Sequence, residues 1–520
     1  MTSATIAPLR FNALTDRWLP LVQEDGSTVW ASPTEVLCGE QDGIDLDYPR
    51  DDFRVYARLL LSALVQALFP AATRRELARR LDEPLDRAHV DAQVHPVLQD
   101  FDLFGPTPFL QIPPPASPPK KDTGAAPFVF PGQDLFQPPV PVDGIVLPIA
   151  LVMLFAEQAY AGGAGRGYGT GPAGQPGALT LIDPGSIRRG AWANTLARDM
   201  AATRYAPDDQ RPWSNAACSA RRRASLGLVT GLFFQPRGIW LIPVGEGVCS
   251  FTGLHGGLVR RSPFLAKSQL APRAQGVEDL WPHPCAPLAV NSQGLGPVRL
   301  HAERPAWTGL AQLLDPVSKK ARHAEHPLAG PALVLREWKE LGTRHKRPRL
   351  LVLDFDRDKA NVKRRFFERF PLTDLLIGKT EAVERLRVVL DDAQQVRSIL
   401  VRALTRAHDG QRRGGLALKD AETSYWVASE RAFLAWLSAA TTVEQWTPED
   451  EALLEQHTQR MRSATRQVAQ TIFDAHVSVS EFDPRKQARV AVARRWLRQH
   501  LYASDRVPQR HDAPAIEVTT

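Results

Sequence analysis

A chain of 520 residues is too long for one hydrophobic core, so its length predicts two to four domains. Hydrophobic residues make up 43% and charged residues 23%, a balance typical of globular proteins, and no run approaches the roughly 18 apolar residues of a membrane span. Four scattered cysteines without CxxC spacing argue for a reducing compartment and against a cysteine-based zinc site. The N-terminus lacks the apolar stretch of a signal peptide, and a cytoplasmic location is expected.

The first 370 residues mix short apolar runs with prolines, glycines and a few helices. Helical spacing of apolar residues predicts a helix over 52–69, and a continuous apolar run predicts another over 147–159. Strand-like segments lie at 238–243 and 350–355. This mixture predicts an N-terminal domain of mixed α/β structure over residues 1–370.

A segment rich in glycine, residues 162–174, follows the second of these helices. It lacks the GK[ST] of a phosphate-binding loop, and it follows a helix instead of the strand that precedes a dinucleotide fingerprint. Glycine lets the backbone approach a ligand closely, which favours a binding role. A flexible linker is the alternative, but the position of the segment inside a folded region counts against it.

The stretch from Leu341 to Phe370 holds ten basic and four acidic residues, an excess of six against a net charge of +7 for the whole chain. Such a local positive potential favours a polyanion such as nucleic acid, and a solvated surface face is the alternative. Asp354 and Asp356 would point to one face of a strand, as a magnesium site needs. No further ligand motif accompanies them, so ion pairing with the basic neighbours is the favoured interpretation.

From about residue 371 the pattern becomes almost wholly helical. Periodicity predicts helices over 380–408, 419–442, 448–478 and 484–502, joined by short connections that favour antiparallel neighbours. The predicted fold class is therefore α+β, with a large mixed N-terminal globular domain followed by a C-terminal four-helix bundle of residues 371–520.

Several short motifs follow one another along the chain, namely FNALTDRWLP at 11–20, LDYPRDD at 46–52, FV at 128–129 before PGQ at 131–133, the glycine segment, GLFFQP at 231–236, LWPHP at 280–284 and SYW at 424–426. The proline on either side of His283 predicts a fixed structural turn in LWPHP, the sixth of them. In order and spacing these motifs resemble the CasA family, the large subunit of the type I-E CRISPR surveillance complex called Cascade.

The resemblance implies a non-catalytic subunit of antiviral defence that recognises the protospacer-adjacent motif (PAM) in target double-stranded DNA. Such a subunit promotes initial strand separation for guide RNA pairing and helps to recruit a nuclease-helicase. The implied partners are the Cascade backbone and small subunits, the 5′ handle of the crRNA, the target duplex and the recruited nuclease-helicase, with no cofactor. Reading from the minor groove, whose code is degenerate, implies a tolerant set of PAMs.

The resemblance also assigns candidate site residues. The glycine loop is Gly162, Gly163, Ala164 and Gly165, and a lysine that enters the minor groove is Lys267, with Ser268 as the alternative position. The strand-separating wedge is a hairpin at Arg357–Asn361, in which Lys359 replaces the usual glutamine beside Ala360 and Asn361. Phe128 matches an aromatic residue that contacts the RNA handle, although core packing is an equal alternative for this ring.

Some relatives carry a cysteine cluster near residues 245–257, where this chain has only Cys249, so no metal is expected. Two other functions stay open beside the Cascade subunit. One is a magnesium-dependent nuclease or phosphodiesterase that uses Asp354 and Asp356, although two-metal chemistry needs more carboxylates than these two. The other is a general nucleic-acid-binding scaffold that does not read a PAM.

Overall fold

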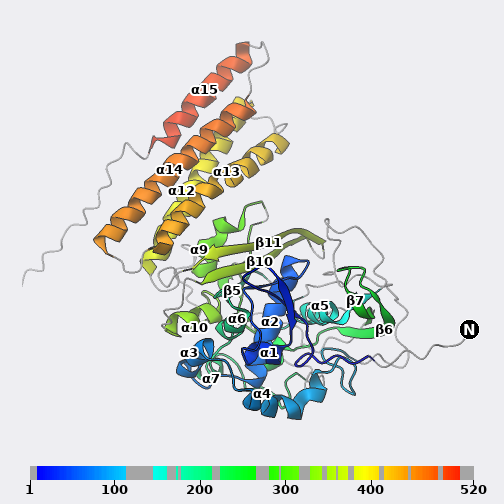
Figure 1. Ribbon diagram of the computed structural model, residues 1–520. Helices are drawn as coiled ribbons and strands as arrows, with labels where there is room; N and C mark the ends of the chain where they lie inside the picture. The colour runs from blue at the N-terminus through cyan, green and yellow to red at the C-terminus, as the bar shows by residue number, and fades with distance from the viewer. Residues whose placement is uncertain are drawn as a thin grey trace, which may run out of the picture. The chain divides into compact units, whose positions relative to one another are not determined.

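The structure is a computed structural model. It describes residues 9–112, 144–160, 171–173, 177–213, 223–264, 280–291, 294–301, 303–315, 328–341, 348–358, 361–372, 380–408, 415–442, 447–477 and 484–503. Contacts divide the chain into two units, Met1–Ala302 with Gln312–Gly378, and Glu303–Ala311 with Lys379–Thr520. The first unit mixes helices and strands, and the second is helical (Figure 1).

The strands are β1 Leu19–Val22, β2 Thr28–Ala31, β3 Asp45–Leu46, β4 Ile145–Val146, β5 Leu179–Asp183, β6 Gly238–Val248, β7 His255–Phe264, β8 Leu288–Asn291, β9 Gly294–Pro297, β10 Arg349–Asp358 and β11 Asn361–Pro371. The helices before the bundle are α1 Pro33–Leu37, α2 Asp51–Leu68, α3 Arg74–Asp82, α4 Arg87–Val94, α5 Leu147–Ala159, α6 Ile187–Ala193, α7 Arg198–Ala202, α8 Leu228–Leu232, α9 Leu310–Leu314 and α10 Leu333–Leu341. Three short 3₁₀ helices are η1 His95–Phe101, η3 Arg223–Ser225 and η4 Ala306–Gly309. The bundle helices are α12 Thr380–Ala407, α13 Gly415–Thr442, α14 Pro448–His476 and α15 Pro484–Leu501.

The first unit is organised around α2, which is buried on nearly every side. A helix that is apolar all round belongs in a core, and α2 packs against both α5 and α6. The helix also carries charged residues, including Arg58. The side chain of Arg58 is only 6% exposed and therefore needs carboxylate partners. Those partners come from two strands, β3 and β5, and are described below.

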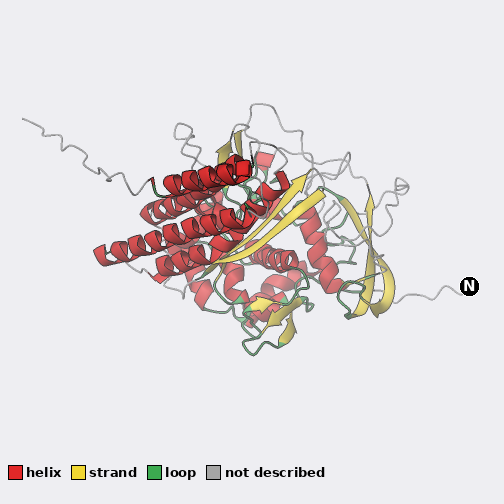
Figure 2. Ribbon diagram, turned by 90° about the horizontal axis from the view of Figure 1, so that it is seen from above, coloured by secondary structure: helices red, strands yellow, loops and turns green. Residues whose placement is uncertain are grey.

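The described strands of this unit form small sheets in the orders β2-β1-β3, β11-β10-β5, β4-β7-β6 and β8-β9. Two long antiparallel hairpins, β6–β7 and β10–β11, are visible as extended yellow ribbons in Figure 2. The middle of β10, from Leu350 to Leu353, is fully buried because this strand lies between β11 and β5. The hairpin is therefore rooted in the core.

The second unit holds four long helices, α12 to α15, side by side (Figure 1). Thr447 caps α14 through a reciprocal hydrogen-bonded pair with Asp450, and Pro448 occupies its first turn, as expected of a helix start. A short upstream segment also joins this unit, because the ring of Trp307 stacks on Phe433 with centroids 4.6 Å apart. Residues 303–311 therefore contribute core to the bundle although the first unit resumes after them.

The predicted α+β fold class is confirmed, and the four predicted bundle helices are present. The starts of three of these helices agree, whereas α13 begins at Gly415, four residues before the predicted 419, within a stretch that contains two glycines. The strand predicted over 238–243 continues to Val248 because it keeps pairing with β7. None of the described helices combines the length and apolar character needed to cross a membrane.

Candidate nucleic-acid interface

Most of the site residues assigned by resemblance lie outside the described residues, namely Gly162, Gly163, Ala164, Gly165, Lys267, Lys359, Ala360 and Phe128. Asn361 is described as the first residue of β11. Three of the four segments, all except the one around Phe128, are bordered closely by described residues. The framework that holds these borders in place is therefore the part of the interface that the structure defines.

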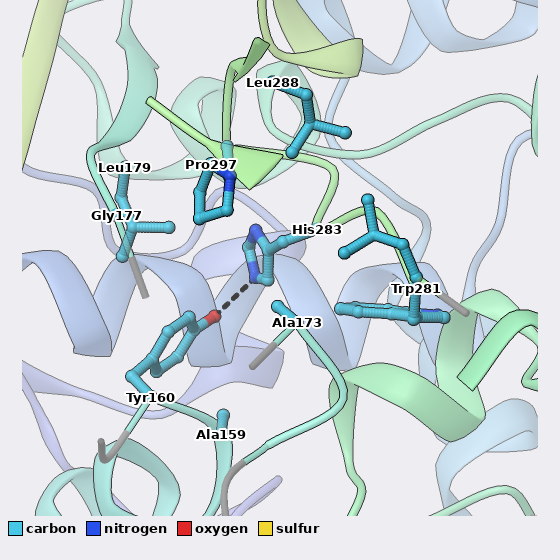
Figure 3. A pocket seen from close by; sticks show the side chains of 11 residues that line it. Ala159, Tyr160, Ala173, Gly177, Leu179, Trp281, His283, Leu288 and Pro297 are labelled. Carbon is cyan, nitrogen blue, oxygen red and sulfur yellow. Dashed lines mark hydrogen bonds between the residues drawn. The ribbon is translucent and has the colours of Figure 1, made fainter. Parts of the chain in front are cut away.

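A buried hydrogen bond anchors the start of the glycine segment (Figure 3). Tyr160 is the last described residue before this segment, and its hydroxyl oxygen lies 2.8 Å from Nε2 of His283. The amide N–H of Cys285 donates to Nδ1 of the same ring at 3.1 Å, so a neutral imidazole carries its proton on Nε2 and donates it to the Tyr160 oxygen. Burial lowers the pKa of His283 to about 3, which keeps the ring neutral in this arrangement.

The predicted structural turn at His283 is consistent with this geometry. The neighbouring Trp281 donates its indole N–H to the carbonyl of Gly227 at 3.1 Å, and its ring lies edge-on to His283 with centroids 5.7 Å apart. The ring of Tyr160 packs in turn on Tyr56 of α2, 5.0 Å between centroids. The turn thus connects the start of the glycine segment to the central helix.

Two glycines fix the other end of the segment by close backbone approach. A Cβ on Gly171 would lie 2.4 Å from the carbonyl oxygen of Ala159, and a Cβ on Gly177 would lie 2.3 Å from the carbonyl oxygen of Val298. Both distances are too short for any side chain. Between these ends lies a cavity of about 20 Å³, lined by Tyr160 and its neighbours, which is room for about one water.

The segment that contains Lys267 begins just after the β6–β7 hairpin. β7 ends at Phe264, which pairs with Gly238 at the start of β6. The hairpin carries a register shift between Pro243 and Gly245, where Gly245 has a φ of +127° that favours glycine. The described part therefore places the start of this segment beside the first residue of β6.

The wedge segment lies at the far end of the β10–β11 hairpin. Asp358 pairs with Asn361, so the two residues between them, outside the described part, form the connection. A register shift between Asp356 and Arg357 precedes this end. Side chains of the basic segment farther along β11 are described, and the ring of Phe366 lies 4.6 Å from the guanidinium of Arg364.

The root of this hairpin is held by ion pairs with carboxylates from two other strands. Arg369 donates to Asp45 of β3 at 2.6 Å, and Arg349 reaches Asp183 of β5 at 2.9 Å. Arg58 of α2 lies between them, 2.9 Å from Asp45 and 3.5 Å from Asp183. We call these five residues the root network. Its two carboxylates bind three arginines, which explains how Arg58 is buried.

The charges of the root network stabilise one another. Burial alone would raise the pKa of Asp45, but the field of Arg58 and the hydrogen bond from Arg369 lower it to about 2. A further arginine of the basic segment, Arg365, lies 3.8 Å from the buried Asp52 at the start of α2. The predicted positive surface is therefore partly neutralised at the root, because three of its arginines face carboxylates.

The two carboxylates considered for magnesium have separate environments. Asp354 is 2% exposed, and it accepts the amide N–H of Leu300 at 2.7 Å and that of Phe355 at 2.7 Å. Asp356 is half-buried opposite Arg364 in the strand register. Within the described part of the chain, no three His, Cys, Asp or Glu side chains gather as a metal-binding group. Asp354 thus serves to fix the backbone of residue 300.

Sequence reasoning had not assigned roles to Tyr160, Asp45 or Asp183. One signal was present: a buried helix with an arginine in its apolar run must find carboxylates, and Arg58 stands in such a run. The identity of those carboxylates could not be read from the sequence, since Asp45 and Arg369 are 324 residues apart.

Comparison with known proteins places this framework in a family. The family model described as CRISPR-associated protein Cse1 matches residues 12–475. CasA (Cse1) of Thermus thermophilus has a similar structure, with a TM-score of 0.69 at 19% identity, covering 95% of this chain and 99% of that one. Thermobifida fusca Cse1 gives a TM-score of 0.73 at 16% identity over 96% of this chain and 98% of that one.

A further similar chain comes from a structure described as a CRISPR RNA-guided surveillance complex. Its TM-score is 0.68 at 18% identity, and the match covers 94% of this chain and 100% of that chain. The structural likeness spans both units, and the family model spans most of the sequence. The chain belongs to the Cse1 family of CRISPR-associated proteins.

Proposed function

We propose that this chain is the large subunit of a type I-E Cascade complex, in which it recognises the PAM of target double-stranded DNA. The observation that carries the proposal is the Cse1 family match over residues 12–475. The similarity to a chain of a CRISPR RNA-guided surveillance complex supports assembly with a crRNA, backbone subunits and small subunits. Recruitment of a nuclease-helicase after target binding belongs to the same proposal.

The glycine loop of residues 162–165 would approach the base edges of the PAM, held by the Tyr160–His283 hydrogen bond on one side and by Gly171 on the other. Lys267 would enter the minor groove from the end of β7. A backbone approach and a single lysine suit a groove whose hydrogen-bonding code is degenerate. Phe128 would contact the RNA handle by stacking.

The wedge at Arg357–Asn361 would separate the first base pair. A hairpin whose far end must push between bases needs a rigid base, and the root network and the buried β10 supply it. Lys359 would contact phosphate, since it offers no amide to a base. The subunit itself is proposed to be non-catalytic, because the carboxylate of Asp354 is occupied by two backbone amides.

The first experiment is assembly with the neighbouring subunits and crRNA, followed by binding to a library of duplexes with randomised PAM positions. Enrichment of a set of related PAMs is expected. Replacing Gly163 or Gly165 with leucine should reduce this discrimination, because the new side chain holds the backbone away from the groove. Equal binding of PAM-bearing and PAM-free duplex by the wild-type complex would instead support a general nucleic-acid scaffold.

The second experiment tests the wedge with Lys359→Ala. Its affinity for duplex should fall, and the slope of log affinity against log salt should decrease by about 0.9, the value for one phosphate contact. A target already mismatched beside the PAM should restore much of the loss, because it needs no unpairing. Lys339→Ala, an exposed lysine of α10, is the matched control. Equal impairment on paired and pre-opened targets would refute the wedge assignment.

A further inference from the structure

The last helix of the bundle, α15, carries a second concentration of positive charge. Its sequence PRKQARVAVARRWLRQHL contains six arginines and lysines and no acidic residue. The buried positions recur at helical spacing and face the bundle core, at Val490, Ala493, Leu497 and Leu501. The basic residues are therefore left around the remaining surface of the helix.

Part of this charge has no carboxylate partner. Arg494 is paired with Asp474 of α14 at 2.8 Å. Arg495 and Arg498 are exposed, and no carboxylate of the described residues lies within ion-pairing distance of either. α12 adds Arg402 to the exposed cationic groups of the same unit. The charges of Arg495 and Arg498 are thus available to a ligand, unlike those of Arg349 and Arg369 at the hairpin root.

An aromatic stack lies on the same helix. The imidazole of His500 stacks on Trp496 with centroids 3.9 Å apart and an interplanar angle of 27°. Nδ1 of His500 lies 2.8 Å from the carbonyl oxygen of Trp496, and this contact holds the imidazole in place. Arg406 of α12 places its guanidinium 3.7 Å from the centroid of the Trp496 ring. His500 is exposed, so the stack ends in a flat ring at the surface.

We propose that α15, together with the end of α12, binds single-stranded DNA. Arg495 and Arg498 contact its phosphates, and an unpaired base stacks on His500. Cationic groups beside flat rings are the combination that binds single strands without sequence preference. The bases of a duplex are already stacked and paired, so the His500 ring offers them nothing. The residues of this surface all lie in the second unit, whereas those of the proposed PAM site belong to the first.

Two other ligands fit the surface less well. A membrane-binding helix needs large apolar side chains on its outer face, and the exposed large apolar residues of the described α15 region are Val492 and Tyr502 alone. An acidic protein would satisfy the arginines but would leave the aromatic stack without a role. Single-stranded DNA accounts for both the arginines and the stack.

The test measures how the full-length chain binds a fluorescent oligo(dT) over a salt series. The oligonucleotide is about thirty nucleotides long, so that it exceeds a single binding site. Arg495→Ala with Arg498→Ala should lower affinity about tenfold or more and reduce the salt slope by about 1.4, the value for two phosphate contacts on a single strand. The matched control is Arg431→Ala with Arg460→Ala, two exposed arginines on α13 and α14. An equal loss in both double variants would overturn the proposal.

The second arm tests the stack with His500→Ala, which should weaken oligo(dT) binding several-fold and leave the salt slope unchanged. Polyglutamate of matched charge should compete poorly. Competition equal to that of oligo(dT) would overturn the proposal in favour of an acidic protein. PAM discrimination by the assembled complex should be the same in all these variants, so failure of the PAM proposal and failure of this one give different results.

Discussion

The β10–β11 hairpin root and α15 have a similar excess of positive charge in the sequence and opposite surroundings in the structure. The segment 341–370 has an excess of six, and α15 has six basic residues with no acidic one. At the root, Arg349 and Arg369 face Asp183 and Asp45. On α15, Arg495 and Arg498 face solvent. A local charge excess therefore does not tell whether that charge stabilises the fold or is available to a ligand.

The reason is that carboxylate partners are supplied from distant parts of the chain. The hairpin root is buried against α2 and β5, whose own charged residues need partners. Buried charges of opposite sign therefore lie next to one another there. Arg495 and Arg498 on the outer surface of α15 are solvated by water, so they need none. Four predictions break or sharpen this comparison.

The largest effect is expected from removing a carboxylate of the root network. Asp45→Ala leaves Arg58 and Arg369 with less compensation and should lower the free energy of unfolding of the first unit by about 3 kcal/mol. Asp474→Ala, which removes the exposed partner of Arg494, should cost about 0.5 kcal/mol or less in the second unit. Denaturant unfolding followed for each unit measures both. Equal costs would mean that the two regions do not differ as described.

Acid should separate the root network from the buried His283. The pKa of His283 falls from 6.5 to about 3 on folding, so the unfolded chain binds a proton that the native chain excludes. Stability from this site is therefore complete above pH 6.5 and falls as the pH is lowered toward 3, by up to about 1.4 kcal/mol per pH unit.

The root network should respond only at lower pH. Asp45, with a pKa lowered from 3.8 to about 2, contributes stability that is present above pH 3.8 and is lost as the pH falls toward 2. Unfolding of His283→Asn should depend less on pH between 6 and 4 than that of the wild type, while Asp45→Ala keeps the wild-type dependence there. An unchanged pH dependence in His283→Asn would contradict the buried neutral ring.

Salt should distinguish buried from exposed pairs with a smaller effect. Raising ionic strength from about 0.1 M to about 1 M shortens the screening length from ~10 Å to ~3 Å, which weakens exposed pairs far more than buried ones. The destabilisation by Asp45→Ala should persist at high salt, and that by Asp474→Ala should vanish. Parallel unfolding series at both salt concentrations measure this. Loss of both differences would show that the root network is solvated.

The smallest effect is expected at Asp356. Asp356→Asn should leave target degradation by the assembled complex and nuclease-helicase unchanged, with a change in stability within about 0.5 kcal/mol. The double change Asp354→Ala with Asp356→Ala should also preserve degradation once assembly is normalised, although Asp354→Ala removes an acceptor of two amides and should cost stability. Loss of all cleavage with target binding preserved would support the nuclease alternative.

Much of the fold could be predicted because its signals are local. Helical periodicity located α2 and the bundle helices, and a continuous apolar run located α5. Only two strands, β6 and β10, were predicted, and not at their full lengths, because both extend as far as their partners allow. The joining of Trp307 to the bundle was not predicted, since nothing near it in the sequence marks its packing on Phe433.

The candidate site was predicted by resemblance and stays a prediction at Gly162–Gly165, Lys267, Lys359 and Phe128. What the structure adds is the framework beside these segments. The roles of Tyr160 and His283 depend on a contact between residues 123 positions apart, and no spacing rule of a helix or strand predicts such a contact.

The sequence by itself determined the family, the order of the elements and the location of the charged segments, because composition, periodicity and short motifs are properties of neighbouring residues. Only the tertiary structure decided which charges are neutralised and which reach solvent. Burial and ion pairing depend on distances between residues such as Asp45 and Arg369, which folding brings to 2.6 Å from opposite ends of the first unit's sequence. A similar excess of basic residues can therefore be neutralised at a hairpin root in one place and leave arginines such as Arg495 and Arg498 exposed in another.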